Sequence, residues 1–183
     1  MGGRHPMRYD FRSDMILSPA FDYWQAKCGA RVMPRRRDID PTEIPLRLLP
    51  NLQITELVDG GVRIRYRLVG TAIVNAYGAE LTGKYFDQVF SGQRLEHVKA
   101  NYRMICIEKQ PLLACSRYVS ARDVHLFCAR LVMPLSEDDV NINQCLTAMS
   151  FHFLGEASRR SGESFGTSSN FDFANSYSEI VRP

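Results

Sequence analysis

Apolar and polar residues alternate most regularly in the stretch GVRIRYRLVG, residues 61–70. Four apolar residues, from Val62 to Leu68, are separated by three arginines. A period of two predicts a β-strand with one apolar face and one guanidinium face. Residues 71–77 have helical composition, and Gly78 suits a left-handed helix C-terminus. The pattern therefore predicts a strand that leads into a short helix.

The rest of the chain predicts two N-terminal helices, a β-hairpin, two central helices and three more strands. Ser18-Pro19 and Asp40-Pro41 are typical helix starts, because the first residue can cap the helix and proline suits its first turn. Asp59-Gly60-Gly61 is a turn signal within the hairpin. The predicted helices span residues 18–29, 40–50, 71–77, 85–90 and 93–109, and the predicted strands span residues 51–58, 62–68, 112–121, 124–135 and 141–154.

This order predicts an α+β fold with five antiparallel strands and with helices inserted after the second strand. In the last three predicted strands, the side chains that point to either face of the sheet are mostly apolar, so both faces should be covered. We expect the central helices on one face and the N-terminal helices on the other. Trp24 is the largest apolar residue of the first helix and should anchor that helix to the outer sheet face.

Composition divides the chain into three parts. Residues 1–17 are polar and basic and predict a flexible N-terminal tail. Residues 18–154 carry the domain, and the Ser-rich residues 155–183 predict a mobile C-terminal tail. Aromatic residues such as Phe171 and Tyr177 would allow that tail to dock on the domain or on a partner.

Composition and charge exclude several classes of protein. The 183 residues are 45% hydrophobic and 23% charged, which is ordinary for a globular protein. A net charge of +3 is too small to indicate nucleic-acid binding, and five cysteines without CxxC spacing indicate buried thiols in a reducing cytoplasm. No run reaches the roughly 18–20 apolar residues of a membrane helix, and no secretory signal begins the chain. We therefore expect a cytoplasmic protein that does not bind membranes.

Several short motifs occur together in this chain. They are Trp24, PRRRDIDP at residues 34–41, Leu49-Pro50, YRLVGT at residues 66–71, Gly78, LTG at residues 81–83 and MPL at residues 133–135. With these motifs, residues 18–154 resemble the PAS-like family of small bacterial proteins long catalogued as a domain of unknown function. The resemblance implies a PAS fold, a sensory or protein-interaction role in a single-domain protein, and no enzymatic activity.

A cavity between the sheet and the central helices is the first candidate site. We predict that a small apolar or aromatic ligand binds there, because pockets are mostly apolar with a few polar groups. We expect no catalytic residue and no cofactor. The predicted lining residues are Ile64, Tyr66, Leu68, Tyr77, Tyr85, Phe86 and Tyr102.

The second candidate site is an interaction face made of Trp24, Arg63, Arg65 and Arg67. Its arginines should point toward the N-terminal helices or a partner, and the same face could form an isologous homodimer. Nucleic acid is not expected, because bases stack on aromatic groups beside the cations and Tyr66 lies on the opposite face. The expected partners are therefore a second copy of the chain and a signalling protein.

Two other functions remain as alternatives. A haem-binding sensor needs an axial ligand, for which His97 on the predicted long helix is the candidate, although a lone histidine beside a core face is more often a surface or satisfied group. A small enzyme would need Asp87, His97 and Tyr85 to meet in one cavity. A structural zinc is not expected, because neither His125 nor His152 has other ligands at zinc spacing.

Overall fold

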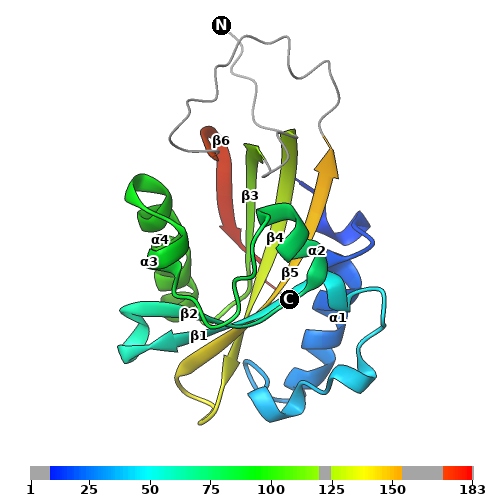
Figure 1. The fold of residues 1–183 in the computed structure, drawn as a ribbon. Coiled ribbons are helices and arrows are strands. Elements are labelled where there is room, and N and C mark those ends of the chain that lie inside the picture. Colours follow the sequence, from blue (N-terminus) through cyan, green and yellow to red (C-terminus); the bar gives the residue numbers. More distant parts are fainter. Residues whose placement is uncertain (1–8, 120–124, 154–170, 183) are drawn as a thin grey trace, which may run out of the picture.

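The computed structural model describes residues 9–119, 125–153 and 171–182 (Figure 1). Its centre is one antiparallel sheet in which the strands lie in the order β2-β1-β5-β4-β3-β6. The α+β fold class is therefore confirmed, with a sixth strand added beside β3. The strands are β1 (Leu52–Val58), β2 (Arg63–Val69), β3 (Leu112–Val119), β4 (His125–Ser136), β5 (Ile142–Phe153) and β6 (Phe171–Ile180).

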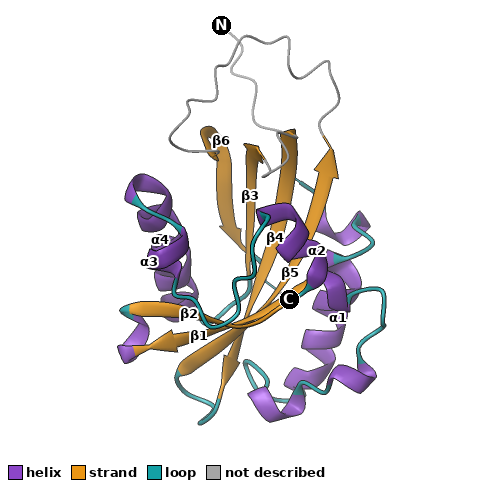
Figure 2. Ribbon diagram, viewed as in Figure 1, coloured by secondary structure: helices purple, strands orange, loops and turns teal. Residues whose placement is uncertain are grey.

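The helices lie on both sides of these strands (Figure 2). The helix α1 contacts β4 and β5 on one side, and α3 and α4 lie on the other side. The α-helices are α1 (Leu17–Cys28), α2 (Thr71–Tyr77), α3 (Phe86–Val89) and α4 (Gly92–Glu108). The short 3-10 helices are η1 (Phe11–Ser13), η2 (Arg36–Asp38), η3 (Pro41–Glu43), η4 (Leu49–Asn51) and η5 (Asp59–Gly61).

The two faces of the sheet belong to separate apolar clusters. The outer face carries Leu113, Leu131 and Leu146, which pack against α1 and the segments around it. The inner face carries Ala114 and Val132, which pack with residues of α3 and α4. Successive strand residues point to opposite faces, so one sheet supplies both clusters. The prediction that helices cover both faces is confirmed.

A β-bulge in β2 changes the expected alternation. Ile54 of β1 pairs with Leu68, whereas the next residue, Thr55, pairs with Tyr66, so Arg67 has no residue opposite it. A bulge of this kind moves the following residues to the other face. Tyr66 is buried, but the side chain of Leu68 is 45% exposed. The strand was therefore predicted correctly, but the face on which Leu68 lies was not.

Gly70 joins β2 to α2 at a very close approach between backbones. A Cβ atom placed on this residue would lie 2.3 Å from the carbonyl oxygen of Pro50. Any side chain there would clash with backbone that cannot easily move. The helix that follows spans the predicted residues and ends at Gly78, which has the expected left-handed conformation with a φ of 71°. The YRLVGT motif thus contains a steric requirement for glycine.

The N-terminal helices differ from their prediction. The helix α1 begins at Leu17, and the carboxylate of Asp14 accepts hydrogen bonds from the N–H groups of Ile16 and Leu17 at 2.7 and 2.8 Å. The predicted helix over residues 40–50 is wrong. Asp40 caps only one 3-10 turn, η3, because Pro45 lacks an N–H group and holds the preceding residue extended.

Parts of the two predicted tails pack on the domain. Tyr9 and Phe11 contact the outer cluster, so the described part of the N-terminal segment is ordered against the sheet. Residues 171–180 form β6, which pairs with β3, and the N–H of Val181 donates to the carbonyl of Pro111 at 2.8 Å. Residues 1–8 and 155–170 of these two segments lie outside the described residues, as do residues 120–124 between β3 and β4.

Candidate ligand cavity

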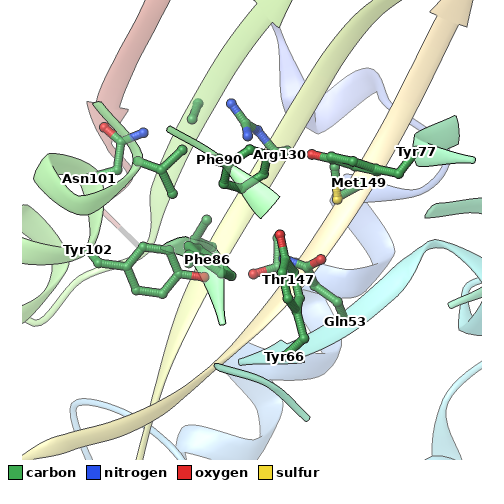
Figure 3. A pocket seen from close by; sticks show the side chains of 13 residues that line it. Gln53, Tyr66, Tyr77, Phe86, Phe90, Asn101, Tyr102, Arg130, Thr147 and Met149 are labelled. Carbon is green, nitrogen blue, oxygen red and sulfur yellow. The ribbon is translucent and has the colours of Figure 1, made fainter. Parts of the chain in front are cut away.

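A cavity lies between the inner sheet face and the central helices (Figure 3). Its volume is about 30 Å³, enough for about two water molecules, since one needs about 10–15 Å³ measured in the same way. It is lined by Gln53, Tyr66, Tyr77, Phe86, Phe90, Val98, Asn101, Tyr102, Ala114, Arg130, Val132, Thr147 and Met149.

Aromatic rings form much of the cavity wall. The ring of Phe86 lies 4.6 Å from Tyr66, 5.8 Å from Phe90 and 5.5 Å from Tyr102, measured between centroids. The last two pairs are edge-to-face, which is a favourable arrangement of aromatic quadrupoles. Tyr77 lies 6.2 Å from Phe90 and extends from α2 toward Arg130 (Figure 3). The cavity thus offers an apolar, ring-lined surface with hydroxyl groups at its edges.

Neutral polar groups complete the wall. Gln53 and Asn101 are only 7% and 6% exposed, and Thr147 is 1% exposed. The hydroxyl groups of Tyr102 and Thr55 are 2.9 Å apart and form a hydrogen bond. Burial raises the pKa of Tyr102 far above its ordinary value, so its phenol stays neutral. These groups can form hydrogen bonds with a ligand without adding charge.

Arg130 is the only charged side chain among the residues that line the cavity. One terminal guanidinium nitrogen, Nη2, donates to the hydroxyl of Ser116 at 3.2 Å. The Nε atom is buried and has no hydrogen-bond partner among the residues that the structure describes. Within the described residues, no carboxylate lies within ion-pair distance of Arg130.

This cation is in an unfavourable position unless something compensates its charge. Arginine stays protonated at neutral pH, and an effective desolvation cost of several kcal/mol is typical for a buried ion. Buried polar atoms without partners are rare in native proteins and commonly indicate a bound water or ion. The cavity therefore combines an apolar wall, neutral donors and acceptors, and one positive charge without a negative partner.

Four of the seven predicted lining residues come together in this cavity: Tyr66, Tyr77, Phe86 and Tyr102. Ile64 is buried in the same cluster but does not line the cavity. Leu68 is turned away by the bulge described above. Tyr85 also lies outside, where its ring stacks under the guanidinium of Arg63 at 3.7 Å.

The predicted interaction face is not one surface. Trp24 is 1% exposed and its Nε1 donates to the carbonyl of Pro134 at 2.9 Å, so it anchors α1 to β4 as expected and is not available to a partner. The arginines have acceptors nearby rather than on the N-terminal helices. Arg63 forms two hydrogen bonds of 2.8 Å with Asp87 of α3, and Arg65 donates to Glu56 of β1 at 2.5 and 2.9 Å. Arg67 lies 4.0 Å from the same Glu56 carboxylate.

The structure also does not bring together the residues proposed for a haem-binding sensor or for a small enzyme. His97 is half-buried on α4 and does not line the cavity. Desolvation and the positive charge of Arg130 lower its pKa below the ordinary value of 6.5. Asp87 pairs with Arg63 outside the cavity. In the described ranges there is no group of three or more potential metal-ligating side chains, and no helix is long and apolar enough to span a membrane.

The prediction from sequence missed the polar half of the cavity, above all Arg130. One signal was available: Arg130 is the only charged residue between Leu126 and Leu135, in a strand that is otherwise apolar on both faces. A lone arginine in such a strand must enter a buried environment, whichever way it points. Asn101 gave a similar signal as a polar residue next to Tyr102 on the apolar side of α4.

A model of the PAS domain family (PAS_5) matches residues 13–150, which is more than half of the chain. The chain belongs to the PAS domain family. PAS domains are sensory modules in general, and the cavity occupies the space between the sheet and helices of this one. The match ends before β6, so the sixth strand lies outside the part of the chain shared with the family model.

Comparison with solved structures gives distant matches to this PAS domain. The Rhodobacter sphaeroides LOV protein is 16% identical, with 61% of this chain and 60% of that chain covered and a TM-score of 0.43. The Vibrio cholera VqmA protein, solved with ligand and DNA, is 11% identical, with 69% and 62% covered and a TM-score of 0.47. This chain thus spans about 60% of the length of these structures. No curated protein matches it.

Proposed function

We propose that this PAS domain is a non-enzymatic sensory module that detects a small molecule in its inner cavity. The observation that carries this proposal is the contrast between the aromatic wall and Arg130 within it, whose buried Nε has no hydrogen-bond partner among the described residues. A protein that used this fold only as a scaffold would gain stability by filling the space with apolar side chains. A retained polar cavity instead supports a binding role.

The size and wall of the cavity support a small ligand with an apolar or aromatic part. The volume of about 30 Å³ is too small for a haem or a flavin without rearrangement of the wall. The output of the sensor would pass through a homodimer or a signalling partner. No contact among the described residues favours one face of the domain over another as the surface for the homodimer or for the signalling partner.

Native mass spectrometry of the purified protein tests this function, with Ala114→Leu as the matched variant. Ala114 is buried in the cavity wall, so the added atoms should occupy the ligand space. We expect the native wild-type protein to be heavier than the chain by the mass of a small bound molecule. This extra mass should be absent after denaturation and absent from the variant. If both proteins have only the mass of the chain, the scaffold function replaces the sensor. The same spectrum reports whether the protein is a dimer.

A further inference from the structure

The charge of the cavity indicates which chemical class of molecule it binds. Its lining contains one arginine and no aspartate, glutamate, lysine or histidine. The Nε–H of Arg130 has no acceptor in the described part of the chain, while its Nη2 donates to Ser116. Guanidinium groups bind carboxylates through two parallel hydrogen bonds, and Nε–H commonly supplies one of them. The Nε–H of Arg130 can therefore donate a hydrogen bond to a carboxylate oxygen.

The surroundings of Arg130 restrict the anion further. A phosphate group carries up to about two negative charges at neutral pH, and a site with one arginine neutralises only one. A monocarboxylate carries one. The remaining wall consists of the rings of Tyr66, Phe86 and Phe90 and the side chain of Met149, which favour an apolar tail attached to the charged group.

Resting on the proposed sensory function, we propose that the cavity binds a small monocarboxylate, with the carboxylate held by Arg130 and the short apolar tail against the aromatic wall. In Figure 3, Tyr77 extends toward Arg130, and Asn101 lines the same cavity from α4. The volume of about 30 Å³ means that the wall must move outward even for a short-chain acid, and a long chain would need a larger rearrangement. Ligand binding would then give the buried cation its missing partner.

Isothermal titration calorimetry with three probes tests the proposal: propionate, its neutral isostere propionamide, and inorganic phosphate. We expect propionate to bind about tenfold or more tightly than propionamide, since hydrogen bonds to a charged partner are the stronger ones. We expect phosphate to bind more weakly than propionate. Equal binding of propionate and propionamide would overturn the carboxylate assignment and leave the small-molecule sensor in place. Tighter binding of phosphate would overturn the monocarboxylate class.

Variants of Arg130 separate its role from general effects on the fold. Arg130→Gln should remove the preference for propionate over propionamide, and Arg130→Lys should keep part of it because the charge remains. Arg67→Gln removes the same charge from an exposed position on β2 and should leave both affinities unchanged. If no probe binds the wild-type protein, the carboxylate proposal is wrong. The mass of any molecule bound to the purified protein then decides the sensor proposal separately.

Discussion

The two faces of the sheet bury side chains of different character, although the same strands supply both. On the outer face, α1 packs Trp24 and Phe21 against apolar residues of β3, β4 and β5, and Trp24 donates its hydrogen bond to the backbone. On the inner face, the helices enclose a cavity with an arginine for which the described residues supply no negative partner. The outer face therefore serves stability, and the inner face retains an unfavourable group for which the proposed binding function gives a reason.

The largest difference should appear when the anchor of the outer face is removed. Trp24→Ala deletes a fully buried side chain and leaves the carbonyl of Pro134 without its donor. We expect the free energy of unfolding to fall by about 3–5 kcal/mol, as in other large-to-small core substitutions. Urea denaturation measures the change. Tyr85→Ala is the matched aromatic control outside the core and should cost less; equal losses would contradict the assignment of Trp24 as the anchor.

A pair of buried alanines compares the packing of the two faces directly. Ala129 on β4 is fully buried in the outer cluster, and Ala114 on β3 is 2% exposed beside the cavity. Ala129→Leu should lower the free energy of unfolding by about 1–3 kcal/mol through overpacking. Ala114→Leu should lower it by less, because the cavity accepts the added atoms. The reverse order of the two losses would show that the inner face has no usable space.

Replacing the cavity arginine should not destabilise the protein, unlike most substitutions of buried residues. In protein freed of bound small molecules by unfolding and refolding, Arg130→Met should leave the free energy of unfolding unchanged or raise it by about 1 kcal/mol, because a buried cation without a partner is replaced by an apolar chain. Arg63→Met, which breaks an exposed pair with Asp87, should lower it only slightly. A loss of stability for Arg130→Met greater than that for Arg63→Met would mean that Arg130 already has a stabilising partner.

The smallest effect concerns His97 and pH. Burial and the charge of Arg130 hold its pKa below 6.5 in the folded protein, so the folded state binds a proton less readily than the unfolded chain. Its contribution to stability is therefore present above pH 6.5 and is lost as the pH falls through the folded-state pKa. An NMR titration should show a higher pKa for His97 in Arg130→Met than in wild type or in Arg67→Gln. An unchanged pKa would place the charge of Arg130 away from His97.

Local patterns predicted most of the fold because they are set by neighbours in sequence. The alternation in β2, the left-handed Gly78 and the apolar stripe of α4 all depend on such neighbours, and the helices and strands around them agree with the structure. Leu68 was misplaced because a bulge depends on pairing with β1. The strand β6 was missed because its pairing partner, β3, lies far away in the sequence: Leu112 pairs with Ile180 and Tyr118 with Phe171. The Ser-rich composition of the surrounding residues also favours a tail over a strand.

The aromatic half of the cavity was easier to predict than the polar half. Tyr66 and Tyr102 lie on apolar faces that the period of a strand or helix indicates. The role of Arg130 depends on what surrounds it: the same residue beside an aspartate would be an ordinary ion pair. Only the three-dimensional structure shows that the lining supplies no such partner.

The most direct test of this account is the NMR signal of the Arg130 side-chain Nε–H during titration with propionate, with Arg130→Lys used to assign the signal. We expect this resonance to move downfield and to saturate as the carboxylate accepts a hydrogen bond from Nε–H. We also expect propionamide to produce a smaller shift. A resonance that stays in place at propionate concentrations that change other cavity signals would show that Arg130 does not bind the anion and would contradict the central claim.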